Sequence, residues 1–130
     1  MSQWQTYNPN PVSRSVGDCA VRAVAKALDM TWERAYAMIA MNGFLMGDVM
    51  TSNGVWGATL RQNGFTRNTV PNTCPDCYTV DEFANDHPEG VYVVGTGNHA
   101  VAVVDGVVYD SWDSRNEIPV YYWVREGDDV

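Results

Sequence analysis

Residues 98–112 read NHAVAVVDGVVYDSW and predict a β-hairpin with two buried strands. The Asp105-Gly106 dipeptide favours a two-residue turn, and the runs on both sides of it are rich in β-branched residues. A turn at this dipeptide places His99 opposite Trp112. Because side chains alternate between the faces of a strand, His99 and Asp110 then fall on one face as diagonal neighbours. Polar groups inside such an apolar run need partners, so we expect the two side chains to be paired.

Such a pair permits two interpretations. A carboxylate that holds one ring nitrogen of a histidine fixes its tautomer and leaves the other nitrogen free to act as a base. The alternative is a self-satisfied pair in the core that performs no chemistry.

A cysteine opens the first helical pattern of the chain, in residues 17–28 (GDCAVRAVAKAL). Apolar residues recur at helical spacing, and Asp18 is a favourable N-cap residue, which predicts a helix from about Cys19 to Leu28. Unpaired backbone N–H groups at a helix start favour the thiolate and are able to bind an oxyanion, whereas the charge of Asp18 disfavours the thiolate. The alternative role for Cys19 is that of a small buried hydrophobe.

The remaining patterns predict an α+β domain. Further helices are expected from Asp29 or Thr31 to about residue 43, over 53–63, and over about 79–86, where Thr79 and Glu82 form a capping box. Strands are expected over 91–95, 99–104, 107–112 and 118–124. The sequence therefore predicts one domain, residues 1–130, whose helical part (about 18–87) packs on a C-terminal antiparallel sheet (about 91–124).

The composition narrows the classes of partner. With 130 residues, 45% of them hydrophobic, the chain is long enough to bury a core. Its net charge of −8 disfavours nucleic-acid binding. No membrane span or signal peptide is recognisable, and three cysteines do not form a closed disulfide framework, so we expect a cytoplasmic protein. The oligomeric state is not predicted.

A C-x-x-C motif at Cys74 and Cys77 offers a second cysteine site. It is interpreted as two loop thiols or a small local disulfide. A zinc half-site with His87 as a further ligand is the minority alternative, because no second C-x-x-C is present. We therefore predict no metal and no cofactor.

The sequences HAVAVV at His99 and YDSW at Tyr109 resemble those of the papain-like cysteine peptidases, in which the base histidine opens a strand and an Asn-Ser-Trp segment lies on the returning strand. Asp110 stands at the position of that asparagine, and Trp112 at that of the shielding tryptophan. The Gly17-Asp18-Cys19 segment is similar to the nucleophile motif of the small bacteriocin-leader-processing (double-glycine) peptidases, which use an aspartate as third residue. The order Cys, His, Asp also matches.

The resemblance implies a papain-like fold and a Cys19–His99–Asp110 triad that hydrolyses a peptide, isopeptide or related amide bond of a protein or peptide through a thioacyl-enzyme, in a bacterial or phage protein. The family's oxyanion glutamine is missing: Ser13 stands at its position, and Asn10 is the substitute we consider. Asp113 is the alternative third member.

Groove candidates are Gly97, Asn98, Trp112 and Trp56, the last two of which are equally well explained as core residues. The competing functions are a transferase or non-peptide amidase with the same triad, and a catalytically inactive papain-like module that binds a protein.

Overall fold

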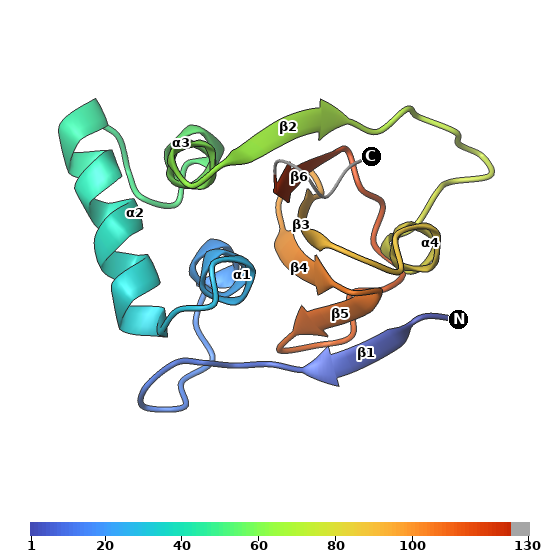
Figure 1. Cartoon of the computed structure of the whole chain (residues 1–130), viewed down its shortest axis with the longest axis horizontal. Coiled ribbons are helices and arrows are strands. Elements are labelled where there is room, and N and C mark those ends of the chain that lie inside the picture. The colour runs from blue at the N-terminus through green and yellow to red at the C-terminus, as the bar shows by residue number, and fades with distance from the viewer. Residues whose placement is uncertain (126–130) are drawn as a thin grey trace.

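A six-stranded mixed sheet lies at the centre of the structure, a computed structural model that describes residues 1–125 (Figure 1). The strands follow the order β1-β5-β4-β3-β6-β2 across the sheet. Their bounds are β1 Gln3–Thr6, β2 Phe65–Thr69, β3 Val91–Gly95, β4 Ala100–Val104, β5 Val107–Asp110 and β6 Tyr121–Arg125. Only the β1–β5 pair is parallel among these strands; the other neighbours are antiparallel.

Helices cover both faces of this sheet. They are α1 Cys19–Ala27, α2 Trp32–Met46, α3 Asn53–Gln62 and α4 Val80–Asp86. Helices α1, α2 and α3 lie on one side and α4 on the other (Figure 1). Along β3 and β4 the side chains alternate accordingly: Val93 and Ala100 belong to the core on the α1 side, and Val94 and Val101 to the core on the α4 side. This double burial explains why the strands are apolar on both faces.

The hairpin at Asp105-Gly106 forms with the predicted register. Val104 pairs with Val107, and Ala102 with Tyr109. Both turn residues have positive φ angles, 50° and 76°, as a two-residue type I′ turn requires. The hairpin prediction is therefore confirmed.

The prediction of a C-terminal antiparallel sheet is wrong in two respects. β1 comes from the N-terminal segment and pairs in parallel with β5, while β2 lies between α3 and α4 and extends the sheet beside β6. Both are edge strands with largely exposed side chains and the polar sequences QWQT and FTRNT. Their hydrophobic alternation is therefore too weak to be recognised in the sequence.

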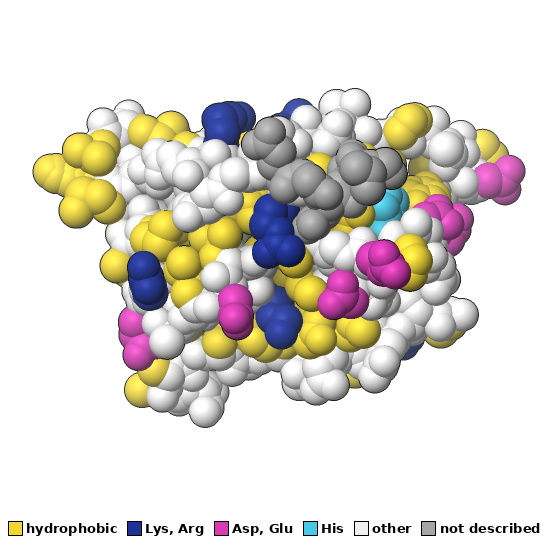
Figure 2. Space-filling view, in the orientation of Figure 1, with side chains coloured by type: hydrophobic (Ala, Val, Ile, Leu, Met, Phe, Trp, Pro, Cys, Tyr) yellow, Lys and Arg dark blue, Asp and Glu magenta, His cyan; other side chains and the backbone are white. Residues whose placement is uncertain are grey.

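Helix α2 is longer than predicted, because Gly43 does not end it. A Cβ on Gly43 would approach the Asp48 carbonyl oxygen to 2.9 Å, so glycine is needed there for the close approach of the following loop. The helix ends instead at Gly47, whose φ is 68°. The last turn carries large exposed apolar side chains, among them Phe44 and Leu45. Figure 2 shows hydrophobic side chains gathered at the corner of the molecule where α2 ends in Figure 1.

Candidate active site

Three elements converge at one end of the sheet. Cys19 is the first residue of α1, His99 immediately precedes β4, and Asp110 is the last residue of β5. Residues that are about eighty positions apart in the sequence thus meet because α1 packs its apolar face against β4.

Asp110 and His99 form a direct hydrogen bond. The distance from His99 Nε2 to Asp110 Oδ2 is 2.6 Å, and the Asp110 side chain is 2% exposed. Asp110 also accepts hydrogen bonds from the Ser114 hydroxyl and from the Ser111 N–H, both at 2.7 Å. Burial raises the pKa of Asp110, but the hydrogen bonds from His99 and Ser114 outweigh burial and hold that pKa below its usual value. A charged Asp110 therefore accepts the Nε2–H of His99 and fixes the orientation of its ring.

The Cys19 thiol is the second partner of the His99 ring. Because Nε2 is held by Asp110, Nδ1 is the ring nitrogen left to pair with Cys19. Burial raises the pKa of the Cys19 thiol, but the His99 hydrogen bond, the Ala100 N–H and the positive charges of His99 and Arg22 bring that pKa below its usual value. Burial also lowers the pKa of His99, but hydrogen bonds to Asp110 and Cys19 raise it to about 9. The lowered pKa of the Cys19 thiol and the raised pKa of the His99 imidazole both favour a thiolate–imidazolium pair at neutral pH.

Arg22 is a member of this cluster that the sequence reasoning missed. It lies on α1 with 8% of its side chain exposed, and it donates from Nη1 to Asp18 and from Nη2 to Asp110 Oδ1, the latter at 3.1 Å. The other oxygen of Asp18 accepts from Trp32 Nε1 at 2.8 Å. Asp18 occupies the predicted N-cap position but makes no side-chain capping hydrogen bond, because its carboxylate is turned towards Arg22. A basic residue within an alanine- and valine-rich helix, four positions after an acidic one, was the signal available in the sequence.

A cavity of about 190 Å³ opens beside Cys19. His99, Asn98 and Trp56 are among its lining residues, together with Met50 and Asn53. Trp56 is 2% exposed and donates from Nε1 to Asn53 Oδ1 at 3.1 Å, so its ring is both core and cavity wall. The cavity thus gives a substrate access to the Cys19 thiol.

Two of the predicted groove residues lie elsewhere. Trp112 is not a cavity residue; it packs on the ring of His99, with 4.9 Å between ring centroids, and remains 44% exposed. Trp112 therefore lies against the imidazole of His99 and not in the cavity wall. Gly97, in the exposed turn before His99, does not line the cavity either.

Neither upstream oxyanion candidate reaches the cavity. Asn10 lies in its own loop, where its Oδ1 accepts hydrogen bonds from the backbone N–H groups of Val12 and Arg14. Ser13 is exposed, with a φ of 58°. The backbone N–H of Cys19, at the start of α1, is the group left to donate a hydrogen bond to an oxyanion.

Asp113 forms an ion pair of its own and does not bind His99. Its carboxylate binds Arg115, with Nη2 to Oδ2 at 2.7 Å, and 40% of its side chain is exposed. The structure pairs His99 with Asp110 and not with Asp113.

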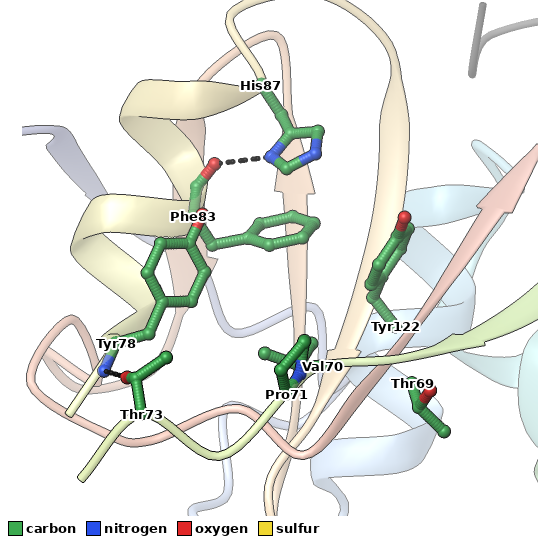
Figure 3. Close-up of a pocket in the computed structure, with 8 residues that line it drawn as sticks. All are labelled: Thr69, Val70, Pro71, Thr73, Tyr78, Phe83, His87 and Tyr122. Carbon is green, nitrogen blue, oxygen red and sulfur yellow. Dashed lines mark hydrogen bonds between the residues drawn. The ribbon is translucent and has the colours of Figure 1, made fainter.

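The C-x-x-C motif forms a disulfide between Cys74 and Cys77. His87 is not its neighbour in a metal site: the imidazole stacks on Phe83, with 4.0 Å between ring centroids, and Nδ1 lies 2.7 Å from the Phe83 carbonyl oxygen (Figure 3). With Tyr78 and Tyr122 these rings line a hollow of about 320 Å³ on the α4 side of the sheet. No cluster of three metal-ligating side chains occurs within residues 1–125.

Comparison with known proteins adds no relative: no family model, no curated protein and no solved structure matches the chain. In the part of the chain that the structure describes, no helix is both long and apolar enough to cross a membrane.

Proposed function

We propose that this protein is a cysteine-dependent hydrolase of papain-like build that cleaves a peptide, isopeptide or related amide bond. The observation that carries the proposal is the relay from the Cys19 thiol through His99 to Asp110, with 2.6 Å between His99 Nε2 and Asp110 Oδ2. A partly buried histidine that is paired with a carboxylate through one nitrogen and with a thiol through the other is the arrangement that thiol-dependent acyl transfer requires.

The reaction uses these groups in two halves. The Cys19 thiolate attacks the carbonyl carbon, and the oxyanion that forms accepts a hydrogen bond from the Cys19 N–H. His99 donates its Nδ1 proton to the leaving nitrogen as the carbon–nitrogen bond breaks, which leaves a thioester on Cys19. Water then gives a proton to His99 and attacks the thioester, and the acid and the thiolate are released with His99 protonated again.

Alkylation of Cys19 by iodoacetamide tests the activated thiol. Cys74 and Cys77 are joined in a disulfide, so Cys19 is the only free thiol of the chain. We expect rapid labelling below pH 7, and a shift of the midpoint towards the ordinary thiol pKa, about 8.5, when His99 is replaced by glutamine. If the unmodified protein already labels with that ordinary midpoint, the proposal fails and the chain is better described as an inactive binding module.

Two aspartate variants, one of them the control, test the third member of the triad. Asp110→Ala removes the side chain that holds His99, whereas Asp113→Ala removes an exposed side chain that is paired with Arg115. We expect the first variant to lose most hydrolysis of an activated ester substrate, of the order of 10³- to 10⁴-fold, and the second to retain it. Formation of the thioester is followed by intact mass; an unmodified Cys19 after incubation with the ester would argue against hydrolase chemistry.

A further inference from the structure

A second hollow adjoins the cavity of Cys19. It has a volume of about 300 Å³ and is lined by Arg61, Arg67, Tyr121 and Trp123, with Asn53 and two glycines of α3. Asn53 lines both hollows, so a substrate bound at Cys19 is able to extend from one into the other.

The sequence builds this hollow from one face of α3 and one face of β6. Asn53, Gly57 and Arg61 are spaced by four residues and therefore lie along one face of the helix. A Cβ on Gly57 would come within 2.8 Å of the Trp123 ring, so glycine is required for the ring to lie against the helix. Tyr121 and Trp123 alternate on the strand and point to the same side of the sheet as α3.

The two arginines are held by rings and not by carboxylates. The Arg67 guanidinium lies 4.3 Å from the centroid of Tyr121, and that of Arg61 lies 5.2 Å from the centroid of Trp123. Within residues 1–125 neither guanidinium takes part in an ion pair or a side-chain hydrogen bond. No carboxylate of this described part of the chain therefore neutralises the two arginines, which leaves both guanidinium groups open to a bound anion.

The register of the sheet sets the distance from this hollow to the thiol. Gly95 pairs with Ala100 on one side and with Tyr121 on the other, and the Tyr121 ring lies over Gly95. Tyr121 is therefore two strand spacings, about 10 Å, from Ala100, whose N–H faces the Cys19 sulfur. An extended peptide advances about 3.3 Å per residue, so a carboxylate in the hollow belongs to a position about three residues from the bond that is cut.

The chemistry of the hollow selects a single carboxylate over a polyanion. The net charge of −8 repels nucleic acid and other highly charged chains over long distances. The planar guanidinium forks match the two oxygens of a carboxylate. We propose that this hollow is a substrate subsite for a carboxylate, carried by an acidic side chain or by the C-terminus of the substrate about three residues from the scissile bond. This inference rests on the proposed hydrolase function.

Binding of uncleaved peptides to the Cys19→Ala protein tests the subsite without requiring activity. The probes are alanine- and glycine-based hexapeptide amides with one glutamate at each position in turn, the matching glutamine peptides, and a neutral peptide with a free C-terminus. The glutamate scan and the free C-terminus distinguish the two sources of the carboxylate.

We expect one acidic probe to bind about tenfold more tightly than its neutral match, an advantage that falls with added salt. Arg61→Gln and Arg67→Gln should each remove most of that advantage. Arg34→Gln removes an equal charge from an exposed position on α2 and should leave it unchanged. Equal binding of acidic and neutral probes, or an advantage that survives in both variants of the hollow, overturns the subsite.

The test of the carboxylate subsite can fail or succeed independently of the test of the hydrolase proposal. Rapid labelling of Cys19 and thioester formation should persist in Arg61→Gln and Arg67→Gln, because neither residue contacts the triad. If the thiol proves ordinary while the acidic probes still bind through the two arginines, the hydrolase proposal fails and the carboxylate site stands as a peptide-binding site.

Discussion

Replacing Arg22 with methionine tests the buried link between α1 and β5. The change keeps a long apolar stem but removes the guanidinium that bridges Asp18 and Asp110, whose side chains are 6% and 2% exposed. Removing one partner of a buried ion pair costs about 3–5 kcal/mol, because a charge is left in a poorly solvated place. Asp110 retains its bonds from His99, Ser114 and Ser111, so we expect the lower end, about 3 kcal/mol.

The pH dependence of this loss has a definite sign. In the unmodified protein the folded pKa of Asp110 is depressed, so its contribution to stability is present above the unfolded pKa, about 3.9, and is lost as the pH falls through the folded pKa. Without Arg22 the pKa of Asp110 rises towards its unfolded value. The deficit of the variant is therefore full at pH 7 and shrinks near pH 4, where Asp110 binds a proton.

Thermal and urea unfolding at the two pH values measure this effect. A loss of about 3 kcal/mol corresponds to a fall in melting temperature of about 10 °C for a domain of this size. Arg22→Lys should recover only part of the loss, because one ammonium does not reproduce the two-pronged contact. The thiol supplies a second readout: the Arg22 charge helps to lower the pKa of Cys19, so Arg22→Met should move the labelling midpoint to higher pH. A variant that melts within 2 °C of the unmodified protein at both pH values (about 0.5 kcal/mol) would refute this account of the bridge.

Three further predictions follow from the same geometry. The kcat/KM of hydrolysis of an amide substrate should fall as the pH rises through about 9, because His99 then loses the proton that the leaving amine needs; a flat profile to pH 10 would contradict the imidazolium role. Trp112→Ala should lower kcat/KM about fivefold by admitting water to the His99–Asp110 hydrogen bond, while the melting temperature hardly changes because the ring is 44% exposed. Gly95→Ala should cost about 1–3 kcal/mol in urea unfolding, since its Cβ would overlap the ring of Tyr121, and the added change Tyr121→Ala should relieve part of that cost; additive losses would show that the two side chains do not clash.

The sequence was sufficient where a local pattern decided the structure. Asp105-Gly106 determined the register of the hairpin, and the register made His99 and Asp110 neighbours before any packing was known. The cap at Thr79 formed as predicted, with its hydroxyl accepting from the Glu82 N–H. These features depend on turn chemistry and alternation, which are properties of a few consecutive residues.

The features that the sequence did not predict depend on contacts between distant segments. β1 is a strand because β5 offers it a parallel edge, and its own sequence, QWQT, has no apolar alternation. Gly43 has the appearance of a helix stop, but its role is to let the loop at Asp48 approach the helix. The role of Arg22 likewise appears only when Asp110 is brought beside α1.

Arg22 also bears on whether the cluster exists for stability or for chemistry. Its Nε lies buried without a hydrogen-bond partner among the described residues, which costs about 1–3 kcal/mol. A buried ion pair is in general no more stabilising than well-packed apolar side chains of similar volume, so stability alone gives no reason for an arginine here. The charges instead alternate along one path, from Asp18 to Arg22, Asp110, His99 and the Cys19 thiolate. Each charge is stabilised by its neighbours of opposite sign, and Arg22 also compensates the one acidic residue that adjoins the thiol in sequence. Considered in the sequence alone, the carboxylate of Asp18 disfavours the thiolate. In the structure Arg22 neutralises that carboxylate and also supports Asp110. This is the arrangement expected if the cluster has been selected to keep Cys19 ionised.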